Sequence, residues 1–140
     1  MWPFGRKGRR RPETADPAGL GARGETLARQ FLKRQGMRIL ARNYRCPVGE
    51  ADLVALDRAT RRDLGSETLV FVEVKTRRAG QLTDPHSAVN AEKRRRMQKV
   101  AAYYLNAHDA EDLPARFDVI SIVVDDRGKP QIQHIPDAFQ

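Results

Sequence analysis

The sequence has few of the residues that build metal clusters, disulfide scaffolds or membrane helices. Cys46 is the single cysteine among 140 residues, which excludes an internal disulfide and a cysteine-rich zinc site. The three histidines, His86, His108 and His134, lack the spacing of metal ligands, and we expect surface or capping roles for them. No apolar run approaches the roughly 18 residues that a membrane-spanning helix requires. These absences fit a cytoplasmic protein without a membrane anchor.

The start of the chain also lacks the apolar segment of a secretory signal, although it contains several basic residues. Residues 1–18 combine glycine, proline and arginine with little that can be buried, so we expect a flexible basic tail there. The remaining residues, 19–140, have the length of one domain.

Acidic residues are outnumbered by basic ones. Lysine and arginine together number 26 against 18 aspartate and glutamate residues, the net charge is +8 and the pI is near 10.2. Such an excess indicates a polyanionic partner, most simply a nucleic acid. Association with a ribosome or a membrane surface would give the same excess, so charge alone names no reaction.

The hydrophobic pattern predicts an α/β domain with the order helix, three strands, helix, two strands. The first helix begins at Gly21 and ends before Gly36. The second is capped by Asp84, has Pro85 in its first turn, and carries an apolar stripe from Val89 to Leu105. The strands are expected at 37–45, 50–57, 69–76, 116–124 and 130–135, with a polar connection over 58–68. The first three strands are most simply an antiparallel meander.

Two charged residues interrupt the most strongly apolar strand. Glu73 and Lys75 lie two positions apart within 69–76, so they share one face of the strand. Burying a charge is costly unless it is paired or binds a metal. Asp52, in the preceding strand, brings a second carboxylate to the neighbourhood, which indicates a metal-dependent site. The alternative is that Glu73 and Lys75 form a solvated stripe on an open sheet face.

Charged residues on the two helices also have two interpretations. Glu25 lies near the start of the first helix, where the helix dipole alone favours a carboxylate. Lys93 occupies a position in the apolar stripe of the second helix, followed by three arginines over 94–96. This turn is either a basic binding surface or a solvated face from which the lysine reaches water.

The combination of these segments resembles the PD-(D/E)XK nuclease superfamily, and within it the bacterial YraN family of predicted endonucleases, which resembles archaeal Holliday-junction resolvases. The resemblance covers roughly residues 21–139. The segments that carry it are Gly24-Glu25, Asn43-Tyr44-Arg45, Gly49-Glu50-Ala51-Asp52-Leu53, Phe71-Val72-Glu73-Val74-Lys75-Thr76-Arg77, Arg116-Phe117-Asp118-Val119 and Ala138-Phe139. The residue before Asp52 is Ala51 and not the proline of the superfamily motif, a proline that is often absent in the superfamily.

The resemblance implies a restriction-endonuclease-like fold, in which a mixed five-stranded sheet is flanked by helices in the order α-β-β-β-α-β-β. It implies that Asp52 and Glu73 bind the metal, that Lys75 orients or deprotonates the attacking water, and that Glu25 completes the site. Basic side chains around them would hold the nucleic-acid backbone: Arg45, Arg77, Lys93, Arg94, Arg95 and Arg96.

The chemistry of phosphodiester hydrolysis accounts for the same residue types. The reaction needs a nucleophilic hydroxide and compensation of growing negative charge, and Mg²⁺ or Mn²⁺ supplies both while preferring oxygen ligands. Adjacent strands lie about 4.8 Å apart, so Asp52 and Glu73 can share one ion if their registers align. Contacts to phosphates give affinity without reading sequence, as expected for an enzyme that recognises nucleic-acid structure.

The sequence therefore predicts a magnesium-dependent nuclease, with DNA favoured over RNA and a branched or structured substrate implied by the resemblance. Two alternatives stay open. One is a non-catalytic nucleic-acid-binding module on the same fold, and the other is an adaptor whose basic face binds an acidic protein. Resolvase-like enzymes pair to cut two strands, so a homodimer is a further expectation.

Overall fold

A mixed five-stranded sheet organises the chain in a computed structural model that describes residues 16–81 and 90–139. The spatial order is β1-β2-β3-β4-β5. Strands β1 to β3 form the expected antiparallel meander, β3 and β4 are parallel, and β4 and β5 are antiparallel. The elements are α1 (Asp16–Arg34), β1 (Arg38–Cys46), β2 (Gly49–Asp57), η1 (Arg58–Thr60), α2 (Arg61–Leu64), β3 (Thr68–Arg78), α3 (Ala91–Ala107), β4 (Ala115–Val124) and β5 (Pro130–Phe139). The predicted fold class is confirmed.

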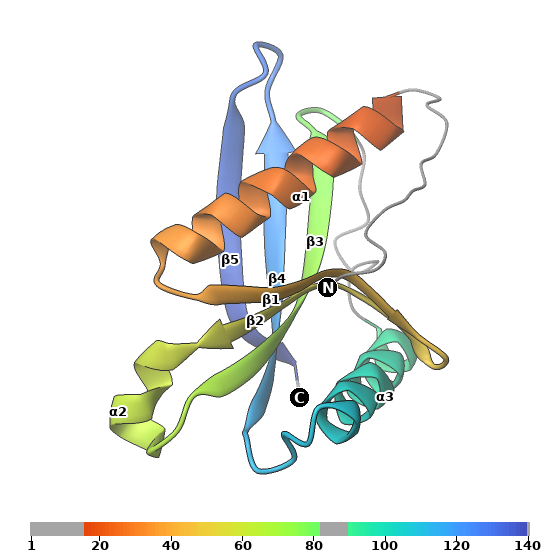
Figure 1. The fold of residues 1–140 in the computed structure, drawn as a ribbon. Helices are drawn as coiled ribbons and strands as arrows, with labels where there is room; N and C mark the ends of the chain where they lie inside the picture. Colours follow the sequence, from red (N-terminus) through yellow and green to blue (C-terminus); the bar gives the residue numbers. More distant parts are fainter. Residues whose placement is uncertain (1–15, 82–89, 140) are drawn as a thin grey trace.

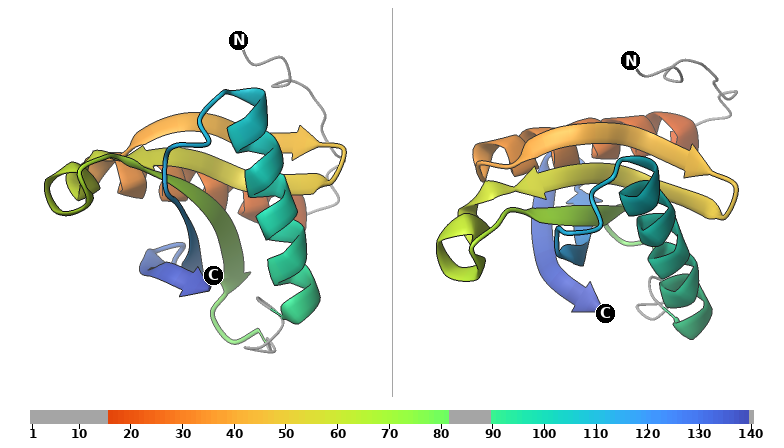
Figure 2. Two further views of the ribbon diagram at one scale, coloured as in Figure 1. Left: turned by 90° about the horizontal axis from the view of Figure 1, so that it is seen from below. Right: turned by 60° about the horizontal axis from the view of Figure 1, so that its bottom comes forward.

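The two long helices cover opposite faces of the sheet (Figure 1; Figure 2). Alternate strand residues point to opposite faces, and each face has its own core. On the α1 side, Leu32 packs with apolar residues of β2, β3 and β4, including Val70 and Ile120. On the α3 side, Val100 packs with Phe71 and Phe117. Burial on both faces explains why β3 reads as a continuous apolar run in the sequence.

The β1–β2 hairpin lies crosswise to β4 and β5 in Figure 1, because the sheet is strongly twisted. The hairpin turn follows Cys46, which pairs with Gly49. Gly49 has a φ of 146°, and an added Cβ there would lie 2.9 Å from the Val100 side chain. Glycine therefore allows both the backbone conformation and the close approach of α3 to the hairpin. This contact places the middle of α3 against the β1–β2 hairpin, while Lys93 in its first turn reaches Glu73 of β3.

Helix α1, the connection after β2 and the end of β5 differ from the sequence-based expectation. Helix α1 begins at Asp16 instead of Gly21, because proline at 17 is compatible with a first helical turn and the nearby glycines are tolerated. The polar connection after β2 folds into η1 and α2, with the Asp57 side chain accepting a hydrogen bond from the Ala59 N–H at 3.0 Å. Strand β5 continues to Phe139 rather than ending at residue 135.

The start of α3 also differs from the expected one. The predicted cap Asp84, together with Pro85 and Val89, lies outside the described residues. The described helix has its own N-cap at Asn90, whose side-chain oxygen accepts a hydrogen bond from the Lys93 N–H at 2.8 Å. The basic tail predicted for 1–18 is likewise described only from residue 16. None of the described helices is long and apolar enough to cross a membrane.

A polar cluster is buried on the α1 side of the sheet, around Asp118 of β4. This side chain is fully buried and binds Arg116 through two hydrogen bonds, of 2.9 and 3.1 Å. It also binds His134 Nε2 at 2.7 Å and the Asp137 N–H at 2.9 Å. Arg116 in turn donates a hydrogen bond to Asp57 at 3.0 Å. Burial opposes the charge on Asp118, but these donors hold the pKa of its carboxyl below the usual value.

The expectation of a surface or capping role for each histidine is therefore wrong for His134. Its ring lies against Phe31 of α1, with centroids 5.7 Å apart, while its Nε2 binds Asp118. His108 does have a capping role, since it is the C-cap residue of α3 and stacks on Tyr104. His86 lies outside the described residues. The Asp118 cluster fastens β5 to β4 and stands apart from the predicted catalytic residues.

Candidate functional site at the fork of β2 and β3

Asp52 lies where β2 and β3 separate. The paired residues of these two strands run from Asp57–Thr68 to Leu53–Val72. Just beyond this point, Asp52 Oδ2 accepts a hydrogen bond from the Val74 N–H at 2.8 Å. The carboxylate thus binds backbone of the neighbouring strand at the mouth of the fork. This bond fixes the orientation of the Asp52 side chain toward β3.

The environment of Asp52 makes its charge costly. Burial is the main cause and the nearby Glu73 carboxylate the second, and together they raise the pKa of Asp52 from 3.8 to about 6. The hydrogen bond from Val74 and the charge of Lys93 oppose this rise. A buried acid with a raised pKa beside a second acid is a common signature of functional sites. A bound cation would relieve the repulsion between the two carboxylates.

Glu73 is held by two lysines from two different elements. Lys93 Nζ, from α3, lies 2.7 Å from Glu73 Oε2, and Lys75 Nζ, from β3 itself, lies 3.4 Å from the same oxygen. Glu73 shares the α3 side of the sheet with Phe71, which explains how a side chain of α3 reaches it. The interpretation of Glu73 as part of a solvated stripe on an open face does not fit, because Lys93 of α3 contacts it and its side chain is largely buried. The Lys75 side chain is 40% exposed, so it does reach solvent.

Glu25 reaches the same neighbourhood from the other side of the sheet. Gly24 packs so closely on β3 that an added Cβ would overlap the hydroxyl group of Thr76. This approach brings Glu25 close enough to contribute to the raised pKa of Asp52. Its carboxylate oxygens each lie 3.4 Å from Asn43 Nδ2 of β1, and Asn43 has a φ of 49°, a conformation that asparagine tolerates.

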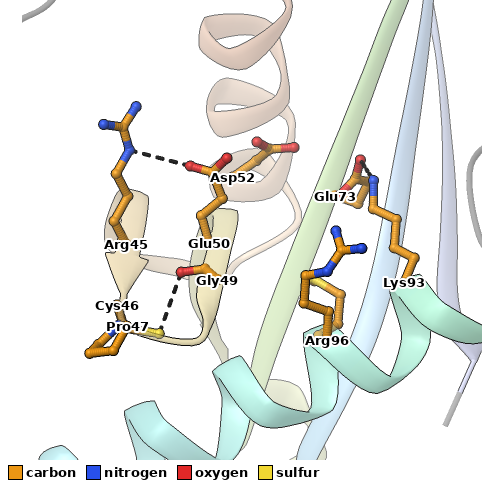
Figure 3. A pocket seen from close by; sticks show the side chains of 10 residues that line it. Arg45, Cys46, Pro47, Gly49, Glu50, Asp52, Glu73, Lys93 and Arg96 are labelled. Carbon is orange, nitrogen blue, oxygen red and sulfur yellow. Dashed lines mark hydrogen bonds and ion pairs between the residues drawn. The ribbon is translucent and has the colours of Figure 1, made fainter.

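A cleft of about 480 Å³ opens in front of Asp52 and Glu73. Figure 3 shows the two acids on neighbouring strands, with Lys93 reaching across from α3. Arg96 of α3 and Arg45 of the β1–β2 hairpin stand at the rim. Both arginines have carboxylate partners on the protein: Arg45 lies 3.3 Å from Glu50 and Arg96 lies 3.5 Å from Glu92. These four side chains are mostly exposed, so solvent screens both pairs.

The predicted nucleic-acid-binding residues divide into two groups. Arg45, Lys93 and Arg96 line the cleft. Arg77 is on β3, half-buried, and Arg94 and Arg95 are exposed on α3, but none of these three lines the cleft. Of the four residues predicted to be catalytic, Asp52 and Glu73 line it, Lys75 adjoins it through Glu73, and Glu25 approaches from α1.

The residues fit a hard divalent cation through two carboxylates only. Within residues 16–81 and 90–139, no three His, Cys, Asp or Glu side chains gather closely enough to hold a metal ion. Glu25 does not complete such a group, since its carboxylate is turned to Asn43. Magnesium typically uses one or two carboxylates with waters and substrate phosphate, so Asp52 and Glu73 meet this requirement, and the raised pKa of Asp52 indicates the charge that a cation would neutralise.

Sequence reasoning missed two contributors to this site. The direct bond of Lys93 to Glu73 has no local signal, because the two residues are distant in sequence and meet only through the packing of α3. The role of Gly24 in admitting α1 to the fork is equally non-local. The Gly-Glu and Asn-Tyr-Arg segments that carry the family resemblance do contain Gly24 and Asn43. Membership in these segments was the one indication in the sequence that the two residues belong to the site.

Fold and site together define an α/β protein with a carboxylate–lysine cleft at the fork of a mixed sheet. The chain belongs to the uncharacterised protein family UPF0102, whose family model matches residues 24–122. That range contains Glu25, Asp52, Glu73, Lys75 and Lys93. The YraN-like family that the sequence resembles is thereby confirmed.

Several relatives are similar over most of their length. A UPF0102 protein of Pelobacter propionicus is 46% identical over 125 residues, which cover 89% of this chain and 85% of the relative. One from Geobacter metallireducens is 46% identical over 86% of this chain and 92% of its own. One from Nocardia farcinica is 41% identical over 89% and 91%. The family thus accounts for nearly the whole described domain.

Proposed function

We propose that this protein is a metal-dependent nuclease of the PD-(D/E)XK type that hydrolyses phosphodiester bonds of DNA, with branched or otherwise structured DNA as its substrate. One observation carries the proposal: Asp52 and Glu73 converge in a cleft, and Lys75 reaches Glu73 from the same strand. A site that only bound phosphate would not need two acids where the substrate's negative charge must lie.

Each residue has a part in the proposed reaction. Asp52 and Glu73 would hold Mg²⁺ or Mn²⁺, which supplies charge neutralisation and an activated water when bound. Lys75 would orient the water and stabilise charge on the phosphate. In the overall step the water oxygen bonds to phosphorus, one P–O ester bond breaks, and one proton of the water passes to the leaving oxygen.

The rim of the cleft would bind the flanking backbone. Arg45 and Arg96 stand where a strand entering the cleft would run, and their exposed carboxylate partners are easily exchanged for phosphates. Such contacts carry affinity without base readout. They suit a substrate recognised by its shape, and cutting both strands of a branched substrate would require two copies of the chain.

A second candidate is a nucleic-acid-binding module without catalysis. One observation favours it: two ammonium groups already neutralise Glu73, and among the described residues no third metal ligand joins the two acids. In that case the lysines would stabilise the fold and the arginines alone would bind nucleic acid.

The deciding experiment is incubation of the purified protein with labelled linear, single-stranded, flapped and four-way DNA substrates and matched RNAs, with Mg²⁺ or Mn²⁺. The proposal predicts metal-dependent cleavage of at least one structured DNA, absent in Glu73→Ala. Tight binding of the same substrates without cleavage under either metal would favour the binding module. Cleavage retained in Glu73→Ala would overturn the catalytic assignment.

A further inference from the structure

Lys93 forms the shorter of the two ion pairs of the Glu73 carboxylate. Lys93 Nζ lies 2.7 Å from Glu73 Oε2, which is the distance of a short charge-assisted hydrogen bond. Lys75 approaches the same oxygen only to 3.4 Å. The Lys93 side chain is 27% exposed and that of Lys75 40%. Lys93 is therefore the nearer and less solvated cation on this carboxylate.

The helix start keeps Lys93 in this position. The Asn90 side chain caps α3 by accepting a hydrogen bond from the Lys93 N–H, so the backbone of Lys93 is fixed in the first turn. Its side chain lines the cleft, as does Met97, which is buried one turn further along. The ammonium group is thus delivered to Glu73 by a fixed helix end, whereas its side chain retains the flexibility to turn into the cleft.

We infer that Lys93 is a positioning residue that acts as a resident counter-ion: it holds Glu73 in the metal-free protein, competes with the divalent cation for this carboxylate, and is released to a phosphate of the substrate. This role rests on the proposed function, because it presumes that Asp52 and Glu73 receive a cation. It deepens that function, because it makes metal binding depend on nucleic acid. A ligand that draws Lys93 away from Glu73 must tighten metal binding, and a bound metal must tighten the binding of that ligand by the same factor.

The competition predicts an effect opposite to that of losing an ordinary site residue. Lys93→Met keeps the unbranched shape and the helix preference of the side chain, is one atom shorter, and removes its charge. The dissociation constant for Mn²⁺, measured by electron paramagnetic resonance of the free ion, should fall about fivefold relative to wild type, which corresponds to about 1 kcal/mol. Lys99→Met makes the same charge change on an exposed position of α3 outside the cleft, and its Mn²⁺ affinity should stay that of the wild type.

Nucleic acid supplies the second readout. A phosphorothioate-protected duplex that resists hydrolysis should tighten Mn²⁺ binding to the wild type by more than it does to Lys93→Met, since only the wild type has an ammonium group to release. If Lys93→Met fails to fold by circular dichroism, Lys93→Gln provides the same neutralisation with a polar end and is measured in its place.

The outcomes separate this inference from the proposed function. Tighter Mn²⁺ binding in Lys93→Met, with Lys99→Met unchanged, supports the inference. Unchanged or weaker binding in Lys93→Met, when the wild type binds Mn²⁺ and Glu73→Gln does not, overturns the inference alone and leaves the nuclease standing. Absence of Mn²⁺ binding in every variant, with and without the duplex, overturns both the metal site and the inference.

Discussion

Replacing Asp52 with asparagine should stabilise the metal-free protein. The pKa of Asp52 is raised from 3.8 to about 6, mainly by burial and then by Glu73. At neutral pH the charged carboxylate therefore costs the folded state about 3 kcal/mol relative to the unfolded chain. Asparagine removes the charge, and its side-chain oxygen can still accept the hydrogen bond from the Val74 N–H. Its amide group needs a partner of its own, which reduces the gain to about 1–2 kcal/mol.

The pH dependence fixes the sign of the effect. Because the folded pKa of Asp52 lies above the unfolded value, the folded state binds more protons between the two, and the contribution of this group to stability falls as pH rises from about 4 to about 6. The advantage of Asp52→Asn should be complete above about pH 6, shrink as the pH falls, and vanish or change sign below about pH 4, because the cost of the amide group does not depend on pH. Groups that do not interact with Asp52, including Asp118, titrate equally in both proteins and cancel in the difference.

The assay is urea unfolding, with thermal melting in parallel, in a metal-free buffer. At roughly 3 °C per kcal/mol for a domain of this size, the melting temperature of Asp52→Asn should rise by about 3–6 °C at pH 7. Glu50→Gln is the matched control, since Glu50 lies on the same strand, lines the same cleft and is mostly exposed, and its effect should stay within about 0.5 kcal/mol.

Addition of millimolar Mg²⁺ should then raise the melting temperature of the wild type, because a ligand of the folded state stabilises by mass action, and should leave Asp52→Asn nearly unchanged. A metal-free Asp52→Asn protein that is less stable than the wild type at pH 7, or whose advantage persists at pH 4, would refute the reasoning from burial and repulsion.

Three further predictions concern packing, the Asp118 cluster and the rim of the cleft. Gly24→Ala should destabilise the fold by about 1–3 kcal/mol through its clash with β3, whereas Gly21→Ala, with nothing nearby, should be neutral or stabilising by up to about 1 kcal/mol; equal effects in urea unfolding would refute the close approach of α1. Asp118→Asn should lower the free energy of unfolding by about 3–5 kcal/mol, because it removes one partner of a buried ion pair. A loss below about 1 kcal/mol would contradict this. Arg96→Ala should reduce the slope of log affinity for DNA against log salt concentration by about one phosphate contact, and Arg95→Ala should leave it unchanged. Fluorescence anisotropy at several salt concentrations measures these slopes. Equal slopes for the two variants would contradict a phosphate contact of Arg96 at the rim of the cleft.

The central strands of the sheet could be predicted because they bury both faces. The runs around Phe71 and Ile120 are apolar at nearly every position, so neither strand has a plausible alternative as a surface loop. The connection after β2 could not be predicted in the same way. Its polar residues fit a loop equally well, and the helical turns there depend on the Asp57 side chain and on Thr60, whose hydroxyl lies 2.8 Å from that of Thr68.

The contacts of the candidate site likewise include some that local sequence predicts and some that it does not. Glu73 and Lys75 share one strand face for purely local reasons, so their proximity follows from the period of a β-strand. The approach of Asp52 to Val74 depends on the register between β2 and β3, and the contact of Lys93 with Glu73 depends on the packing of α3. Neither contact can be predicted from a short segment of the sequence. The contact of His134 with Asp118 could not be predicted from composition or residue spacing for the same reason. It arises from the pairing of β4 with β5.

The most direct test of the central claim is a single-turnover cleavage assay with a labelled four-way DNA substrate in Mg²⁺ or Mn²⁺, comparing wild type, Asp52→Asn, Glu73→Gln and the cleft control Glu50→Gln. The first two substitutions change a carboxylate to its isosteric amide at the fork of β2 and β3, and the third makes the same change at the exposed rim. We predict that the wild type and Glu50→Gln cleave the substrate, while Asp52→Asn and Glu73→Gln bind it but leave it intact. Cleavage by Asp52→Asn and Glu73→Gln at the wild-type rate would contradict the claim that these two acids form the catalytic centre.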